Sequence, residues 1–95
     1  MDDRGYWLAQ GSRASESVCT WSAFVAATEF LWQDPALVKD GDAWQALWFE
    51  LEIVNALALA EWDEQGRPED WSVRWREGYQ QDAGELAAQL LALLA

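Results

Sequence analysis

Apolar residues recur with a helical period in three stretches of the chain, and turn residues separate these stretches. Between residues 15 and 33 apolar side chains follow one another at steps of three and four, the spacing of one face of an α-helix. Asp34 and Pro35 then interrupt the pattern, because the residue before a proline is disfavoured in the helical region. The pattern predicts a first helix over about 15–33.

Two further helices are predicted after this break. Asp42, with a glutamine three residues later, has the spacing of a capping box and indicates a helix over about 43–63. Gly66 suits the left-handed turn after a helix, and Pro68 suits the first turn of the next one. The third helix is therefore predicted over about 68–94, and Gly78 and Gly84 weaken its middle, where a kink or break can occur.

The first fourteen residues show no sustained period, and Gly5 and Gly11 bracket their short apolar piece. We therefore expect an irregular arm over 1–14. With 95 residues, the chain fits one acidic helical domain, 1–95. The predicted fold is all-α: a small three-helix or four-helix bundle with an irregular N-terminal arm.

The helix predicted over 43–63 has two apolar faces. The broader face is the expected core, and the opposite side carries a narrower stripe made of Phe49, Ile53 and Leu57. One interpretation is that the neighbouring helices pack on both sides of a central helix. The other is that the stripe is a docking surface or the seam of a homodimer, edged by carboxylates.

Two polar residues fall among the apolar positions of the predicted helices. Asn55 lies in the middle of the broader face, where an amide without hydrogen-bond partners costs about 1–3 kcal/mol, so we expect it to have partners. Asp82 lies beside Trp71, Trp75 and Leu86 on the third helix, and an ion pair with an arginine is the expected solution.

The residue types present exclude most familiar catalytic chemistry. The chain has no histidine, which removes Ser-His and Cys-His nucleophile pairs and histidine-bound metals. Cys19 is the single cysteine and is predicted to be a free thiol in the core. We therefore predict no enzyme activity and no cofactor.

Residues 61–69 approximate part of an EF-hand calcium loop. Ser72 stands where that loop needs its bidentate glutamate, and Pro68 stands where a backbone N–H is needed. We interpret the segment as an acidic turn between helices and predict no metal site.

The charge of the chain is strongly negative. Seventeen Asp and Glu face six Lys and Arg, a formal net charge of −11. This argues against direct binding to nucleic acid or an anionic membrane and favours a basic protein partner. No apolar run is long enough to cross a bilayer and no secretory signal is recognisable, so a cytoplasmic location is predicted. The carboxylates predicted to face a partner are Glu50, Glu61, Asp63, Glu64, Glu69 and Asp70.

Eight tryptophans in a small acidic chain indicate a binding protein, since tryptophan is enriched at interface hot spots. The leading hypothesis is a small acidic inhibitor of the immunity or phage anti-defence (anti-CRISPR) type. It would cover a basic, nucleic-acid-binding surface of a nuclease, toxin or defence complex. A self-associating helical module with a regulatory or scaffolding role is one alternative. Another is a small-molecule binder whose pocket is formed by Trp44, Trp48, Trp71 and Trp75.

Overall fold

The chain folds into a helical bundle in a computed structural model, which describes residues 3–94. Within this range the only β pairing is one isolated bridge between Val38 and Leu94. The all-α prediction is confirmed. The helices are α1 (Asp3–Ala14), α2 (Val18–Thr28), the short 3₁₀ helix η1 (Leu31–Gln33), α3 (Gly41–Glu64), α4 (Ser72–Gly78) and α5 (Gln80–Leu91).

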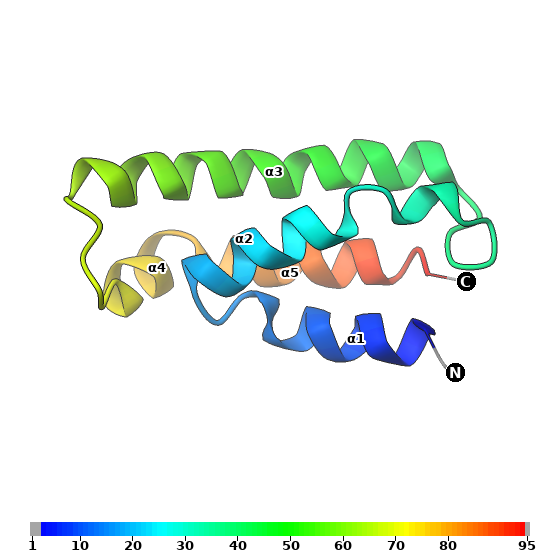
Figure 1. Cartoon of the computed structure of the whole chain (residues 1–95), viewed down its shortest axis with the longest axis horizontal. Helices are drawn as coiled ribbons and strands as arrows, with labels where there is room; N and C mark the ends of the chain where they lie inside the picture. The colour runs from blue at the N-terminus through cyan, green and yellow to red at the C-terminus, as the bar shows by residue number, and fades with distance from the viewer. Residues whose placement is uncertain (1–2, 95) are drawn as a thin grey trace.

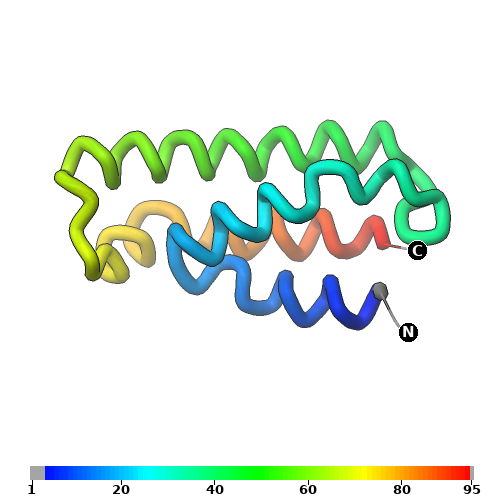
Figure 2. The backbone as a smooth tube through the Cα atoms, viewed as in Figure 1, coloured from blue at the N-terminus to red at the C-terminus, as the bar shows by residue number. Residues whose placement is uncertain are grey.

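Helices α1, α2, α3 and α5 run in alternating directions, and α3 extends along most of the molecule (Figure 1). The packed neighbours are α1 with α2, α2 with α3, α3 with α5, and α5 with α1, which closes the bundle. The short α4 lies at one end, whereas α1 begins and α5 ends at the opposite end (Figure 2). The arrangement is an up-down-up-down four-helix bundle.

The prediction of an irregular arm over 1–14 is wrong, because Asp3–Ala14 forms helix α1. Trp7 and Leu8 pack against the core from this helix. Gly11 lies where α1 meets α5: a Cβ atom there would stand 2.0 Å from Cδ1 of Leu91. The glycine permits a close approach between two helices, and packing offsets its cost of about 1 kcal/mol in helix propensity.

The helix predicted over 15–33 is shorter than expected. Ser17 caps α2, since its Oγ accepts a hydrogen bond from the backbone N of Thr20 at 3.1 Å. The helix ends at Thr28, whose carbonyl oxygen accepts a hydrogen bond from the indole N–H of Trp44 at 3.1 Å. The chain then continues through a turn into η1 instead of extending the same helix. Tertiary contact with α3 therefore sets the end of α2.

The helix predicted over 43–63 spans Gly41–Glu64, and its cap is Asp40, not Asp42. The carboxylate of Asp40 accepts a hydrogen bond from the backbone N of Ala43 at 3.0 Å. Gly66, with a φ of 83°, makes the left-handed turn that follows the helix, as predicted.

The helix predicted over 68–94 is divided in two. Residues 68–71 are not helical, and Tyr79 separates α4 from α5 with a φ of −136°, outside the helical range. The indole N–H of Trp62 donates to the carbonyl of Pro68 at 3.0 Å, which ties the link to the end of α3. These contacts turn the chain back so that α5 can lie antiparallel to α3.

Three tryptophans form the centre of the core. Trp21, Trp44 and Trp75 are at most 1% exposed. The indole N–H of Trp21 donates to the carbonyl of Leu51 at 3.3 Å, and that of Trp75 donates to the carbonyl of Ser15 at 2.8 Å. A buried indole needs such a partner. Each of these tryptophans therefore packs against and hydrogen-bonds to another part of the chain.

Candidate functional site

The apolar stripe of α3, made of Phe49, Ile53 and Leu57, lies on the outside of the bundle. Its members are 60%, 45% and 59% exposed, in that order. They follow one another at steps of four, on the side of α3 opposite the buried Leu51 and Ala58. Of the two interpretations of this stripe, the one in which helices cover both sides is wrong, because α2 and α5 leave it uncovered.

A groove between α3 and α5 adjoins this stripe and has a volume of about 360 Å³. Apolar side chains line its floor, and carboxylates stand on both helices at its edges. We call it the α3–α5 groove. Its residues are Glu50, Ile53 and Val54 of α3, and Asp82, Glu85, Leu86 and Gln89 of α5.

Asp82 belongs to this groove, and the prediction that it pairs with an arginine is wrong. Its side chain is exposed and makes no ion pair within residues 3–94. The break at Tyr79 changes the helical phase, so Asp82 does not share the buried face of Trp71 and Trp75. It lies in the first turn of α5, where a negative charge is favourable to the helix dipole.

Asn55 also differs from expectation. It is buried, with 8% of its surface exposed, and its Oδ1 atom has no hydrogen-bond partner among the described residues. The indole N–H of Trp21 donates to the carbonyl of Leu51 and not to Asn55. Asn55 does not line the α3–α5 groove and is not assigned to the candidate site.

The acidic residues around the link between α3 and α4 are partly neutralised within the chain. Arg74 donates to Glu61 through two guanidinium nitrogens, with 2.7 Å between Nη2 and Oε1, and the hydroxyl of Tyr79 donates to Glu61 at 3.2 Å. Asp63 forms an exposed ion pair with Arg67, with 2.6 Å between the paired atoms. The charges of Glu61 and Asp63 are therefore matched by arginines of the same chain.

Asp70 has a local structural role. Its Oδ1 accepts hydrogen bonds from the backbone N and the hydroxyl of Ser72, at 3.1 and 2.6 Å. These bonds lower the pKa of Asp70 and hold the start of α4. Glu64 and Glu69 are exposed and form no ion pair with the rest of residues 3–94. Among the predicted partner-facing carboxylates of residues 61–70, Glu64 and Glu69 are the least engaged by the chain.

The Glu61–Arg74 pair should give the fold a measurable pH dependence. Hydrogen bonding to Arg74 lowers the pKa of Glu61 below its ordinary value of 4.5. Because the folded pKa is the lower one, the contribution to stability is present above pH 4.5 and is lost as the pH falls through the folded value. We predict that Glu61→Gln is less stable than the wild type at pH 7. This difference should shrink on acidification, as measured by urea unfolding.

The matched control for this measurement is Glu64→Gln, which removes one exposed acid from the same end of α3 without breaking an ion pair. Its difference from the wild type should be small at pH 7. A Glu61→Gln effect that is unchanged from pH 7 to pH 3 would contradict this account of the pair.

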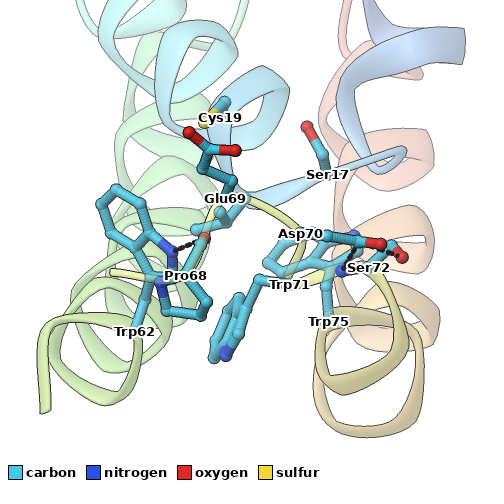
Figure 3. Close-up of a pocket in the computed structure, with 10 residues that line it drawn as sticks. Ser17, Cys19, Trp62, Pro68, Glu69, Asp70, Trp71, Ser72 and Trp75 are labelled. Atoms are coloured by element: carbon cyan, nitrogen blue, oxygen red, sulfur yellow. Dashed lines mark hydrogen bonds between the residues drawn. The ribbon is translucent and has the colours of Figure 1, made fainter. Parts of the chain in front are cut away.

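A second recess, of about 220 Å³, lies between the start of α2, the end of α3 and the link to α4 (Figure 3). Cys19 is exposed at this recess, so the prediction of a core cysteine is wrong. The side chain of Glu69 points toward this recess (Figure 3). The ten lining residues are Ser17, Val18, Cys19, Trp62, Pro68, Glu69, Asp70, Trp71, Ser72 and Trp75.

This recess is not the pocket predicted from four tryptophans. Trp71 and Trp75 line it, but they are 6% and 1% exposed. Trp44 is fully buried elsewhere in the core, and Trp48 donates its indole N–H to the carbonyl of Val25 at 2.9 Å. The four tryptophans therefore do not line one open pocket.

Neither metal chemistry nor a membrane span is indicated by the described residues. Over 3–94, no three Asp, Glu or Cys side chains are placed to hold a metal ion together. None of the helices in this range combines the length and the apolar character that crossing a membrane requires.

The candidate site is a surface, formed by the α3 stripe together with the α3–α5 groove. Comparisons of the chain with protein-family models, with curated proteins and with solved structures gave no match. The geometry of this surface on a four-helix bundle is the basis for the functional proposal.

Proposed function

We propose that the protein is a small acidic inhibitor that binds a partner protein through the α3 stripe and covers a basic surface of that partner. The exposed stripe carries this proposal. Three large apolar side chains on one helix face, next to a groove with an apolar floor, form a surface of the kind that binds proteins. The central tryptophans are buried in the core, so the stripe supplies the apolar contacts.

The charge around the stripe favours a basic partner. Glu50, Asp82 and Glu85 border the groove, and none of them forms an ion pair within residues 3–94. The whole chain has a formal net charge of −11. A homodimer through this face would bring two acidic surfaces together, whereas a basic protein would be attracted and oriented.

A basic surface of this kind is typical of proteins that bind nucleic acids, because binding to a phosphate backbone depends on Lys and Arg. An acidic protein that covers such a surface competes with the nucleic acid. The proposed role is therefore that of an inhibitor of the immunity or anti-defence type, acting on a nuclease, a toxin or a nucleic-acid-binding defence complex.

Affinity capture from the source organism tests this proposal. The tagged protein is incubated with lysate cleared of nucleic acid, washed at low or high salt, and analysed by mass spectrometry. We expect a basic nucleic-acid-binding protein that is retained at low salt and released at high salt, since screening weakens exposed charge pairs. Adding our protein to the purified target should then reduce binding of the target to nucleic acid.

Recovery of the tagged protein alone, as a dimer or larger assembly, would replace this proposal with the self-associating module. A captured target whose nucleic-acid binding is unchanged by the protein would contradict the inhibitor function while leaving a binding function.

A further inference from the structure

We propose, resting on the function proposed above, that the α3–α5 groove holds a basic amphipathic helix of the partner. Helix-in-groove binding needs an elongated apolar floor between two elements and polar groups along the edges. Ile53, Val54 and Leu86 supply the floor from both helices. The groove therefore offers apolar contacts from two helices, which a helical ligand needs.

The spacing of the groove residues supports a helical occupant. The groove residues of α3 are at positions 50, 53 and 54, and the apolar stripe continues to position 57. The groove residues of α5 are at positions 82, 85, 86 and 89. Both rows advance by three and four residues, so each helix presents a ridge against which a third helix can pack. From residue 49 to residue 57 the stripe rises about 12 Å, which matches two to three turns of a bound helix.

The carboxylates at the edges of the groove indicate which residues the bound helix carries on either side of its apolar face. Glu50 stands on the α3 side, and Asp82 and Glu85 stand on the α5 side. All three are exposed, so a ligand with Lys or Arg on both sides of its apolar face could pair with them. The required pattern is apolar residues at three- and four-residue steps with basic residues on either side.

A second copy of this chain does not supply that pattern. Helices α2, α3 and α5 contain no Lys or Arg. The six basic residues of the chain lie elsewhere: Arg4 and Arg13 stand near the two ends of α1, and Arg67 and Arg74 are already paired with acids. None of the described helices carries basic residues on both sides of a continuous apolar face. The partner is therefore a different protein.

A designed peptide probes the groove directly. The probe is an 18-residue peptide of leucine and lysine with leucines at helical spacing, and the control is a peptide of the same composition with that spacing scrambled. Binding is followed by fluorescence anisotropy, and the bound face is mapped by ¹⁵N chemical shifts. We expect the amphipathic peptide to bind more tightly, with the largest shifts at residues 50–57 and 82–89.

Two variants with the same change in net charge separate the groove from general attraction. The groove variant is Glu50→Gln, Asp82→Asn and Glu85→Gln. The control is Glu16→Gln, Asp42→Asn and Glu77→Gln, all at exposed positions outside the groove. The groove variant should bind the peptide about tenfold more weakly than the wild type, and the control should lose much less.

Equal binding of the scrambled peptide, equal losses in both variants, or shifts concentrated on α1 would overturn the inference. This outcome is distinct from failure of the proposed function. If a basic target is captured equally well by the groove variant, the groove does not bind a helix of that target, but the inhibitor function still stands. If the peptide binds the groove but no basic target is captured from the lysate, the helix-binding groove stands and the inhibitor function is contradicted.

Discussion

Trp75→Ala lowers the free energy of unfolding by about 3–5 kcal/mol, the cost of removing a large aromatic side chain from a close-packed core. Trp75 is 1% exposed, and its ring lies 6.4 Å from that of Trp21 and 5.8 Å from that of Tyr79, between centroids. Its indole N–H also donates to the carbonyl of Ser15. The substitution removes contacts that join α4 to α2 and to the turn between α1 and α2.

Two control variants separate ring packing from the hydrogen bond. Trp75→Phe keeps an aromatic ring but removes the indole N–H, and the amide of Gln80 remains to serve the carbonyl of Ser15. We therefore expect a smaller loss than for Trp75→Ala. Val73→Ala, on the same helix at a side chain that is 58% exposed, should change stability by less than about 0.5 kcal/mol. Urea unfolding measures all three.

A Trp75→Ala variant no less stable than Val73→Ala would contradict the placement of Trp75 in the core. An equal loss for Trp75→Ala and Trp75→Phe would assign the effect to the hydrogen bond and not to the ring.

The long helix α3 and its exposed stripe could be predicted from the sequence because both depend on local pattern. The helical period continues without interruption along α3, so it determines which side of the helix each residue faces. Phe49, Ile53 and Leu57 therefore fall on the side opposite Leu51. The sequence left open whether another helix covers the stripe. That depends on how the helices are arranged around α3, which periodicity does not specify.

Helix α1 was missed because its stabilisation comes from tertiary packing. Gly11 weakens a helix in isolation, but it permits the close contact with Leu91 of α5. The division of the third helix at Tyr79 falls beside Gly78, one of the two glycines at which the sequence allows a kink or break. The glycine at position 78 gives a signal for a break, yet it does not determine the direction in which α5 continues.

The acidic residues within 61–70 show why counting charges along a sequence has limited value. Arg74 lies thirteen positions after Glu61, and the return of the chain through α4 brings the two together. Asp82 was assigned to a buried face and lies on the edge of the groove. The strongest candidate surface therefore combines the stripe and Glu50, which the sequence predicted, with Asp82 and Glu85, which only the fold brings beside them.

Replacing the stripe should abolish tight binding while leaving the fold intact. The variant is Phe49→Ser, Ile53→Ser and Leu57→Ser, and all three positions are exposed. Apolar side chains at the centre of an interface cost about 2 kcal/mol or more when truncated, so we expect affinity for the captured target to fall at least about 30-fold. Each exposed substitution should change stability by no more than about 0.5 kcal/mol.

The chain offers a matched control, because three other large apolar residues are exposed outside the stripe. Tyr6, Phe30 and Val73 are 55%, 62% and 58% exposed. The control variant carries serine at these three positions. It removes a comparable apolar surface without touching α3, so a general loss of surface hydrophobicity affects both variants.

The most direct test of the account is the dissociation constant of the captured target for the wild type, the stripe variant and the control, measured by titration at low and at physiological salt. The account predicts tight, salt-sensitive binding by the wild type and the control, and a loss of at least about 30-fold for the stripe variant. Equal affinities for the stripe variant and the control would contradict it, because the target would then bind a different face of the bundle.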